Sequence, residues 1–309
     1  MSRANVSTLN GVFPTDDEAQ RLIVGPDSVT WQFASDVRLY LAPLYALLLQ
    51  VAYPTVAAGV RHYSDFERRP WQRLWATIDY LLVLNYGGRD AIAMGCRLRE
   101  LHKGFRGRKP DGEPYYALER DAYAWVHATL IDSYVSGHRH FGRPMTPSQV
   151  ERFYRESLGL GRLIGVREGD LPSDWSGFRA YFERTVADQL GPSDTVERVL
   201  RAVGDPAAPE VPFLPEPLWK VLRLPARRAV YLGGVGLLTP ELRARLQIAW
   251  TRRDMAEFRA LSAGSRALTP LLPKRLKLFG PTQLRWRAEA IARGPLGSHG
   301  ALQGTSGSA

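Results

Sequence analysis

Residues 39–60 read LYLAPLYALLLQVAYPTVAAGV and form the longest run without a charged residue in the 309-residue chain. By length alone, such a run is sufficient to cross a bilayer. However, Pro43, Gln50, Pro54 and Gly59 interrupt the run, and Pro54 divides it into two segments of the length of core helices. The run therefore predicts two buried helices and not a transmembrane span.

Prolines, glycines and capping residues mark the ends of further helices. Thr146-Pro-Ser-Gln149 is a capping box with proline at the first helical position, and a Thr-Pro-Glu sequence begins again at Thr239. The strongest strand candidate, residues 230–232, is followed at once by glycines, which predicts a turn between helices. The fold class is therefore all-α, with helices expected at about 70–86, 89–105, 119–135 and 147–158.

We expect one large helical domain at residues 31–293, because the segments on both sides of the proline-rich connector at 206–217 need each other to cover their apolar faces. Residues 1–30 are an expected N-terminal extension. Residues 294–309 are rich in Gly and Ser, which predicts a disordered tail. The first 17 residues lack the charged start and apolar stretch of a signal peptide, so we expect a cytoplasmic protein.

The formal net charge of +10 is concentrated near the C-terminus. Residues 218–293 carry +12 and residues 1–217 carry −2. Such a block fits a nucleic acid, an anionic membrane surface, anionic groups of a ligand, or simply a solvated helical surface. The single cysteine, Cys96, excludes a disulfide framework and zinc sites that need two thiolates.

Three basic residues share one predicted helical face. Arg99, His102 and Arg106 are spaced i, i+3 and i+7, which places them in one row on a continuous helix. The row can be an exposed basic stripe. It can also serve a ligand that has both a metal and carboxylates, with the imidazole on the metal and the guanidinium groups on the carboxylates. Haem has both features.

Other residues give weaker signals. His127 lies in an apolar helical segment and is more typical of a hydrogen-bonded core histidine than of a ligand. Arg73 and Thr77 are spaced i and i+4 and share a face. The pair His138 and His140 follows the expected helix end and predicts a surface loop. Cys96 does not share the face of His102 and is expected to be a small buried hydrophobe.

These motifs, taken in order, resemble the MpaB/rubber oxygenase catalytic-domain family, which includes the latex clearing proteins. The similar segments lie between about residues 30 and 280: Leu48-Leu-Gln-Val-Ala-Tyr-Pro54, Arg73 with Thr77, Arg99-x-x-His102-x-x-x-Arg106-Gly107, Trp125-Val-His-Ala-Thr129 and Leu237-Leu-Thr-Pro-Glu-Leu-Arg243. The resemblance implies an all-helical fold with a buried pocket for haem b, and a reaction that uses dioxygen.

The resemblance also implies roles for individual residues. His102 is the expected proximal ligand of the iron, and Arg99 and Arg106 support it or the haem propionates. Arg73 and Thr77 match a distal arginine and threonine. His127 falls in a segment that lines the haem pocket of relatives, so it is the second candidate for axial ligand or catalytic pocket residue.

The chain also departs from the family pattern. Latex clearing proteins carry a lysine immediately before the distal threonine, where this chain has Ala76. A distal lysine ligand is therefore not expected, and the polyisoprene substrate does not transfer. Gln50 and Asp65 are candidate neighbours for a distal acid, with no motif to decide between them.

The sequence therefore predicts a haem-dependent oxygenase or oxidase that acts on a small apolar or amphipathic substrate and takes electrons from a donor. The alternatives are haem binding without turnover, or a basic helical surface that contacts nucleic acid or a membrane. The basic stretch has no helix-turn-helix or basic-zipper pattern, so no nucleic acid partner is expected. We expect no transmembrane segment, and peripheral membrane contact stays open.

Overall fold

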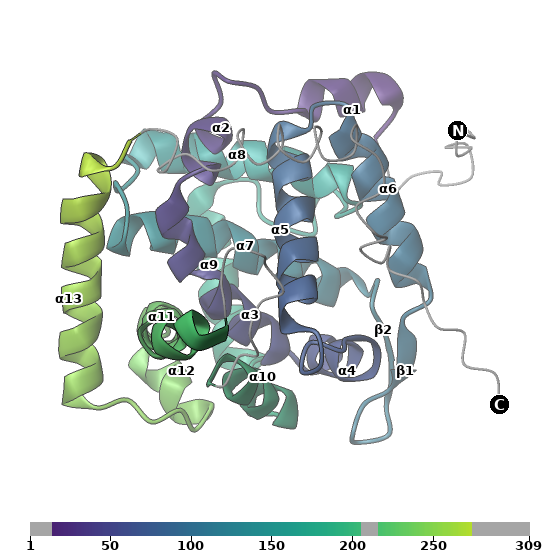
Figure 1. Ribbon diagram of the computed structural model, residues 1–309. Coiled ribbons are helices and arrows are strands. Elements are labelled where there is room, and N and C mark those ends of the chain that lie inside the picture. Colours follow the sequence, from purple (N-terminus) through teal and green to yellow (C-terminus); the bar gives the residue numbers. More distant parts are fainter. Residues whose placement is uncertain (1–13, 205–215, 274–309) are drawn as a thin grey trace.

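The computed structural model describes residues 14–204 and 216–273, which form helices packed in layers and one small hairpin (Figure 1). The N-terminal part contains α1 (Asp16–Leu22), α2 (Val29–Ala34), the 3-10 helix η2 (Val37–Leu41), α3 (Pro43–Val51), α4 (Pro54–Tyr63), α5 (Pro70–Tyr86), α6 (Asp90–Lys103), β1 (Arg106–Arg108) and β2 (Pro114–Tyr116). The rest contains α7 (Arg120–His140), α8 (Pro147–Leu163), α9 (Trp175–Asp188), α10 (Asp194–Gly204), α11 (Glu216–Leu237), α12 (Pro240–Arg245), α13 (Arg252–Leu268) and the 3-10 helix η3 (Thr269–Leu271). The all-α prediction is confirmed.

The uncharged run at residues 39–60 forms the two predicted helices. Pro43 and Pro54 occupy the first positions of α3 and α4, where a missing N–H costs nothing, and the two axes meet at 104°. Most of α3 is buried. In the part of the chain that the structure describes, no single helix is long and apolar enough to cross a membrane, and this bent pair meets that test only when both arms are joined.

The core forms around α7, which packs against α3, α4 and α8. Trp125 of α7 is completely buried and donates a hydrogen bond from Nε1 to the Leu49 carbonyl oxygen at 3.0 Å. Asp132, one of the few buried acids, accepts hydrogen bonds from the Tyr45 hydroxyl at 2.7 Å and from Nη1 of Arg179 at 2.5 Å. Since each carboxylate oxygen has a partner, the charge is accommodated in the interior.

The predicted turn at residues 230–232 is wrong, because α11 continues through it to Leu237. The glycines that suggested a turn are instead places where α11 touches another segment. A Cβ atom on Gly233 would lie 2.2 Å from the Leu41 carbonyl oxygen, and one on Gly234 would lie 2.5 Å from the Leu44 Cβ. Only glycine permits this close packing of α11 against η2 and α3.

The predicted surface loop at His138 and His140 is also wrong. The helix α7 does not end at Gly137 but continues to His140. Gly137 has a packing role instead: it lies against Leu39, and its lack of a side chain provides room for that contact. His138 is buried and donates from Nε2 to the Phe33 carbonyl oxygen at 3.0 Å. Burial lowers the pKa of His138 to about 4.

A short antiparallel hairpin follows α6, where the sequence predicted no strand. Arg106 pairs with Tyr116, and Arg108 pairs with Pro114. The Tyr63 side chain at the end of α4 fixes the start of the hairpin. Its hydroxyl donates to the Arg106 carbonyl oxygen at 2.9 Å, and its ring stacks on that of Phe105 with 4.2 Å between the centroids.

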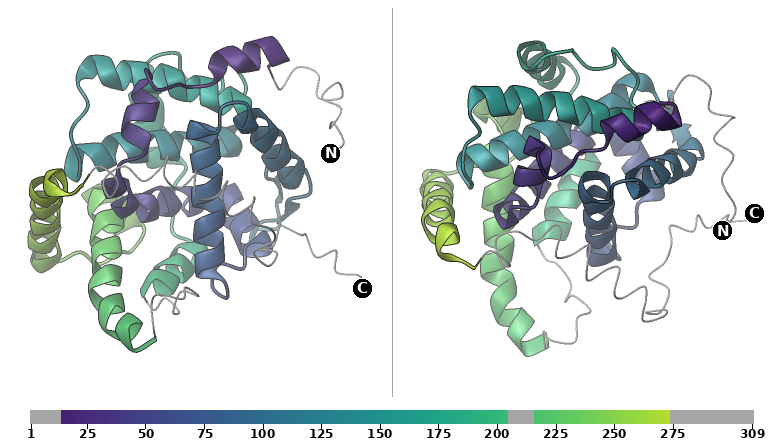
Figure 2. Two further views of the ribbon diagram at one scale, coloured as in Figure 1. Left: turned by 45° about the horizontal axis from the view of Figure 1, so that its top comes forward. Right: turned by 90° about the horizontal axis from the view of Figure 1, so that it is seen from above.

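The first two helices are attached to α8, as both views in Figure 2 show. The Glu156 carboxylate of α8 accepts hydrogen bonds from the backbone N–H groups of Val29 at 3.1 Å and Thr30 at 2.7 Å. These are free donors of the first turn of α2, so an acid is favourable there. The domain boundary at residue 30 stays a prediction. The predicted tail and residues 206–215 of the predicted connector lie outside the described residues.

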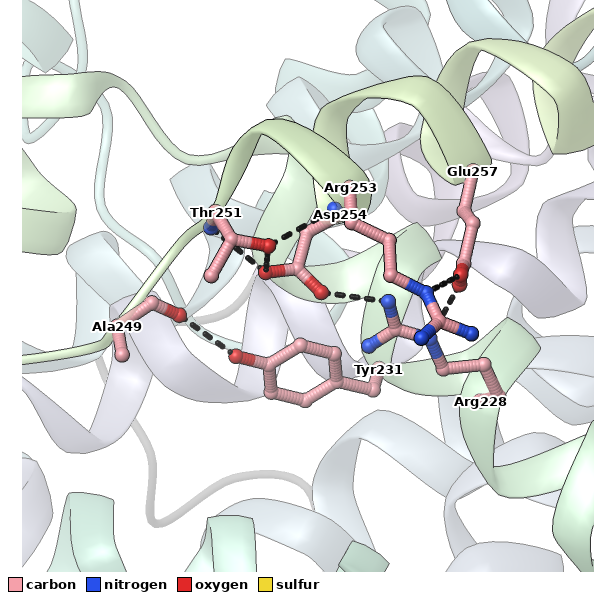
Figure 3. A network of polar contacts seen from close by, with 7 residues as sticks. All are labelled: Arg228, Tyr231, Ala249, Thr251, Arg253, Asp254 and Glu257. Carbon is pink, nitrogen blue, oxygen red and sulfur yellow. Dashed lines mark hydrogen bonds and ion pairs between the residues drawn. The ribbon is translucent and has the colours of Figure 1, made fainter.

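Part of the basic C-terminal region is neutralised by ion pairs between α11 and α13 (Figure 3). Arg228 donates from Nη2 to Asp254 at 2.5 Å and from Nε to Glu257 at 2.7 Å. Asp254 also closes a capping box with Thr251 at the start of α13. Hydrogen bonds from Thr251, followed by those from Arg228, lower the pKa of Asp254 to about 2.

Candidate functional site

His102 lies in the last turn of α6, which begins at Asp90 and ends before Gly104. Its Nδ1 is 2.7 Å from the Leu98 carbonyl oxygen one turn earlier. A carbonyl oxygen can only accept, so Nδ1 carries the hydrogen and Nε2 of the neutral ring keeps a lone pair. A histidine that binds a metal is commonly held in this way, with one nitrogen on a backbone carbonyl and the other free to coordinate.

Aromatic rings and a positive charge surround this imidazole. The Phe105 ring centroid lies 5.1 Å away, and the Tyr123 ring approaches edge-on at 6.0 Å. Burial lowers the pKa of His102, and the positive charge of Arg73 lowers it further, against the hydrogen bond to Leu98. The ring is therefore neutral at pH 7, which is the form that can coordinate a metal.

The helix α5 packs along α6, and the Arg73 charge on α5 is close enough to His102 to lower its pKa. Arg73 is half-buried. Thr77, one turn later, is exposed, and its hydroxyl donates to the Arg73 carbonyl oxygen at 3.0 Å. Because α5 packs along α6, Arg73 and His102 lie close together although they are about 30 positions apart in the sequence.

The structure separates the two arginines that the sequence placed on the His102 face. Arg99 stays on α6, is half-buried, and donates from Nη1 to the Gly165 carbonyl oxygen at 3.4 Å. Arg106 is not on the helix: α6 ends before Gly104, and Arg106 is an exposed residue of β1. The expected i, i+3, i+7 row is therefore wrong at its last member.

His127 occupies a different position, in the core between α7 and α8. It is 5% exposed, and its Nε2 donates to the Ser157 carbonyl oxygen at 2.7 Å. A Cβ atom on Gly161 would lie 2.8 Å from the same nitrogen. Burial lowers the His127 pKa. Since Nε2 is engaged by α8, a ligand role would fall to the buried Nδ1, for which the described residues supply no hydrogen-bond partner.

Sequence reasoning missed Tyr123, which lies next to His102, and Tyr80, which lies close to Tyr123. Tyr123, from the first turn of α7, donates to the Ile164 carbonyl oxygen at 2.9 Å. Tyr80 of α5 has a buried hydroxyl for which the described residues offer no acceptor. A helical signal for Tyr80 was present, because it is three residues after Thr77 and seven after Arg73. No comparable signal pointed to Tyr123.

The remaining candidates lie in other surroundings. Gln50 donates to the Thr129 hydroxyl in the core at 2.9 Å, and the Asp65 carboxylate pairs with Arg69 at 3.2 Å. Cys96 is a free, half-buried thiol whose pKa is raised by burial, which disfavours a thiolate ligand. Across residues 14–204 and 216–273, no group of three or more His, Cys, Asp and Glu side chains could hold a metal ion.

A shallow surface cleft of about 440 Å³ lies elsewhere, between the α1–α2 segment and α8. Arg21, Arg152 and Arg155 are among its lining residues, and none of the predicted site residues is. The strongest juxtaposition of sequence-predicted residues is therefore the one around His102.

Comparison with known proteins agrees with the motifs. A family model described as "ER-bound oxygenase mpaB/B'/Rubber oxygenase, catalytic domain" matches residues 31–267. Two mycobacterial relatives, uncharacterized protein Mb2261 of Mycobacterium bovis and uncharacterized protein Rv2237 of Mycobacterium tuberculosis, are each 28% identical over 258 residues, which is 82% of this chain and 97% of theirs. No solved structure gives a significant match. The chain thus belongs to the family of ER-bound mpaB-type oxygenases and rubber oxygenases, and residues 31–267 form its oxygenase catalytic domain.

Proposed function

We propose that the protein is a haem b-dependent oxygenase or oxidase that uses dioxygen, with His102 as the axial ligand of the iron. The observation that supports this most directly is the Nδ1 hydrogen bond from His102 to the Leu98 carbonyl oxygen, which leaves Nε2 available for a metal. Haem iron needs only one or two protein ligands, so a single histidine is sufficient.

The surroundings of His102 fit haem. The Phe105 and Tyr123 rings provide apolar contact for a flat macrocycle. Arg73 and Arg99 are the nearby cations that would pair with haem carboxylates, and Arg106 at the hairpin is a more distant third. Tyr80 offers a buried donor that lacks an acceptor among residues 14–204 and 216–273. His127 stays the second candidate for axial ligand or pocket residue.

Each residue then has a definite task. The Leu98 carbonyl fixes the tautomer and orientation of the imidazole, and Phe105 and Tyr123 limit its rotation. Arg73 would supply positive charge beside the ring, and together with the Thr77 hydroxyl it would set the polarity around the bound group. When bound, haem supplies the oxygen chemistry, while the protein contributes placement and electrostatics. We propose a small apolar or amphipathic substrate and an external electron donor.

The absorption spectrum after haemin addition tests this proposal. Wild-type protein is expected to show a Soret band that saturates at one haemin per chain. His102→Gly should lose or shift the band, and added imidazole should restore it by replacing the missing side chain. His62→Gly, at an exposed histidine, is the matched control and should behave as wild type.

Two outcomes count against this assignment. A wild-type protein that stays colourless with haemin contradicts haem dependence. A band that persists in His102→Gly but disappears in His127→Gln assigns the ligand to His127 instead. Substrate-free haem binding with no turnover of any apolar compound under reducing, aerobic conditions would favour the alternative of haem binding without catalysis.

Contact with a membrane surface is a second proposal, favoured by the first half of α11. Leu218, Val221, Leu222 and Leu224 are exposed there, Val221 to 68%, and the exposed Arg227 follows. Apolar and basic side chains together suit an anionic lipid surface. We propose a cytoplasmic protein that is peripheral to the membrane. Flotation with anionic but not with neutral vesicles, and loss of flotation in Val221→Glu, would support it; equal behaviour of both vesicle types would contradict it.

A further inference from the structure

The hydroxyl of Tyr80 is a buried donor without an acceptor. Its oxygen is shielded from solvent, and no hydrogen-bond partner exists for it among the described residues. Buried polar groups in folded proteins are satisfied by the protein, by water or by a ligand, because an unsatisfied one costs free energy. The position of Tyr80 therefore leaves room for a hydrogen-bond partner that the described residues do not supply.

Three other tyrosines with buried or half-buried side chains donate to acceptors within the protein. Tyr86, two turns later on α5, donates to the Trp31 carbonyl oxygen at 3.1 Å. Tyr123 donates to the Ile164 carbonyl oxygen at 2.9 Å. Tyr45 donates to the Asp132 carboxylate at 2.7 Å. Tyr80 differs from these three, because its buried hydroxyl has no acceptor among the described residues.

The register of α5 places Tyr80 on the same face of the helix as Arg73, two turns later. Arg73, Thr77 and Tyr80 follow one another at helical spacing on one face. Arg73 acts on His102 through its charge. The Tyr80 hydroxyl is also close enough to Tyr123 for the two to interact electrostatically, and the Tyr123 ring lies 6.0 Å from that of His102. Tyr80 and His102 thus approach the same neighbour from two different helices.

We propose that Tyr80 is a positioning residue of this site, whose hydroxyl donates a hydrogen bond to an oxygen atom of the group bound beside His102. The inference rests on the proposed haem function. A phenol donates well to a carboxylate or to another electronegative oxygen. Two sources can supply that oxygen: a haem propionate, or a small oxygen-containing ligand beside the iron.

Tyr80→Phe tests the role, with Tyr86→Phe as the matched control on the same helix. The change at Tyr80 removes a hydroxyl that has no partner in the described part of the chain, so the haem-free form should be at least as stable as wild type. The change at Tyr86 breaks a hydrogen bond, so its haem-free form should unfold at lower denaturant concentration while haemin binding stays unchanged. This opposite pattern separates a role in ligand binding from a role in folding.

Two measurements identify the acceptor. If it is a propionate, Tyr80→Phe should bind haemin roughly tenfold or more weakly than wild type, and this difference should vanish with haemin dimethyl ester. If it is a small ligand, haemin binding should stay equal, and the infrared stretching frequency of added carbon monoxide should shift in the reduced protein. Either result supports the proposal.

The proposal is overturned if Tyr80→Phe matches wild type in haemin affinity and in carbon monoxide frequency. It is also overturned if haem-free Tyr80→Phe is destabilised as much as Tyr86→Phe, because the hydroxyl would then have a partner in the protein. Failure of wild type to bind haemin overturns the proposed function together with this inference, whereas normal wild-type binding with an unaffected Tyr80→Phe overturns this inference alone.

Discussion

Gly95→Ala should show how tightly α6 is held. Gly95 lies in the middle of α6, where the backbone of the helix meets the end of α8. A Cβ atom at this position would lie 1.9 Å from the Leu163 carbonyl oxygen and 2.8 Å from the carbonyl carbon. Because nonbonded heavy atoms settle at roughly 3.5–4.0 Å, α6 and α8 have to separate. Overpacking costs about 1–3 kcal/mol, and a clash with backbone places this variant near 3 kcal/mol.

The clash and the helix propensity of alanine act on the stability of Gly95→Ala in opposite directions. In a helix without the clash, the same substitution would stabilise by about 1 kcal/mol through helix propensity. Thermal unfolding should show Gly95→Ala about 6 °C below wild type, at roughly 2 °C per kcal/mol for a chain of this size. Gly104→Ala is the control, since its Cβ would meet the nearest atom, the Leu101 carbonyl oxygen, only at 3.8 Å, and it should stay within about 1 °C of wild type.

The same variant tests whether the position of α6 matters for the proposed site. Separation of α6 from α8 displaces His102, so haemin should bind more weakly to Gly95→Ala and normally to Gly104→Ala. If Gly95→Ala is as stable as wild type, the α6–α8 contact is not tight and the reasoning is refuted.

Three further predictions concern buried and paired charges. Asp132→Asn should lower the free energy of unfolding by about 2 kcal/mol, measured by denaturant titration, because it removes the buried charge that pairs with the half-buried Arg179, which keeps Glu183 as its other partner; a loss below about 0.5 kcal/mol would contradict this. The pKa of His138 is lowered from 6.5 to about 4, so the unfolded chain binds more protons and stability should fall as the pH drops from about 6.5 to 4; His138→Gln should flatten this decline. The pKa of Asp254 is lowered from 3.8 to about 2, so its contribution is present above about pH 4 and is lost as the pH falls toward 2; an unchanged acid profile in Asp254→Asn would exclude it.

The helices could be predicted where their signals act within a few residues. Pro43 and Pro54 each begin a helix, and Thr146 and Gln149 form the expected capping box. Gly137 could not be interpreted in the same way. It looked like a helix end, but its small size accommodates Leu39, which is about 100 positions away in the sequence. A local pattern cannot distinguish a glycine that stops a helix from one that admits a neighbour.

At the candidate site too, local spacing predicted some neighbours correctly, and contacts between distant segments were not predicted. Helical spacing alone grouped Arg99 with His102, and the family resemblance added Arg73. The prediction failed at Arg106 because α6 ends at Lys103, three residues earlier than the spacing required. The surroundings of His127 could not be predicted from the local sequence, since they come from Ser157 and Gly161 on another helix.

The attachment of α6 has a consequence for biosynthesis. One end of the helix depends on the Tyr63 contact to the hairpin, and its middle depends on Gly95 against Leu163. The first contact joins residues about 40 positions apart in the sequence, and the second joins residues about 70 positions apart. Contacts between such distant residues form slowly during folding. A nascent chain that ends before α8 therefore lacks the surface that positions His102. Under the proposed function, haem would be loaded only after residue 165 has emerged from the ribosome, which makes loading a late step in maturation.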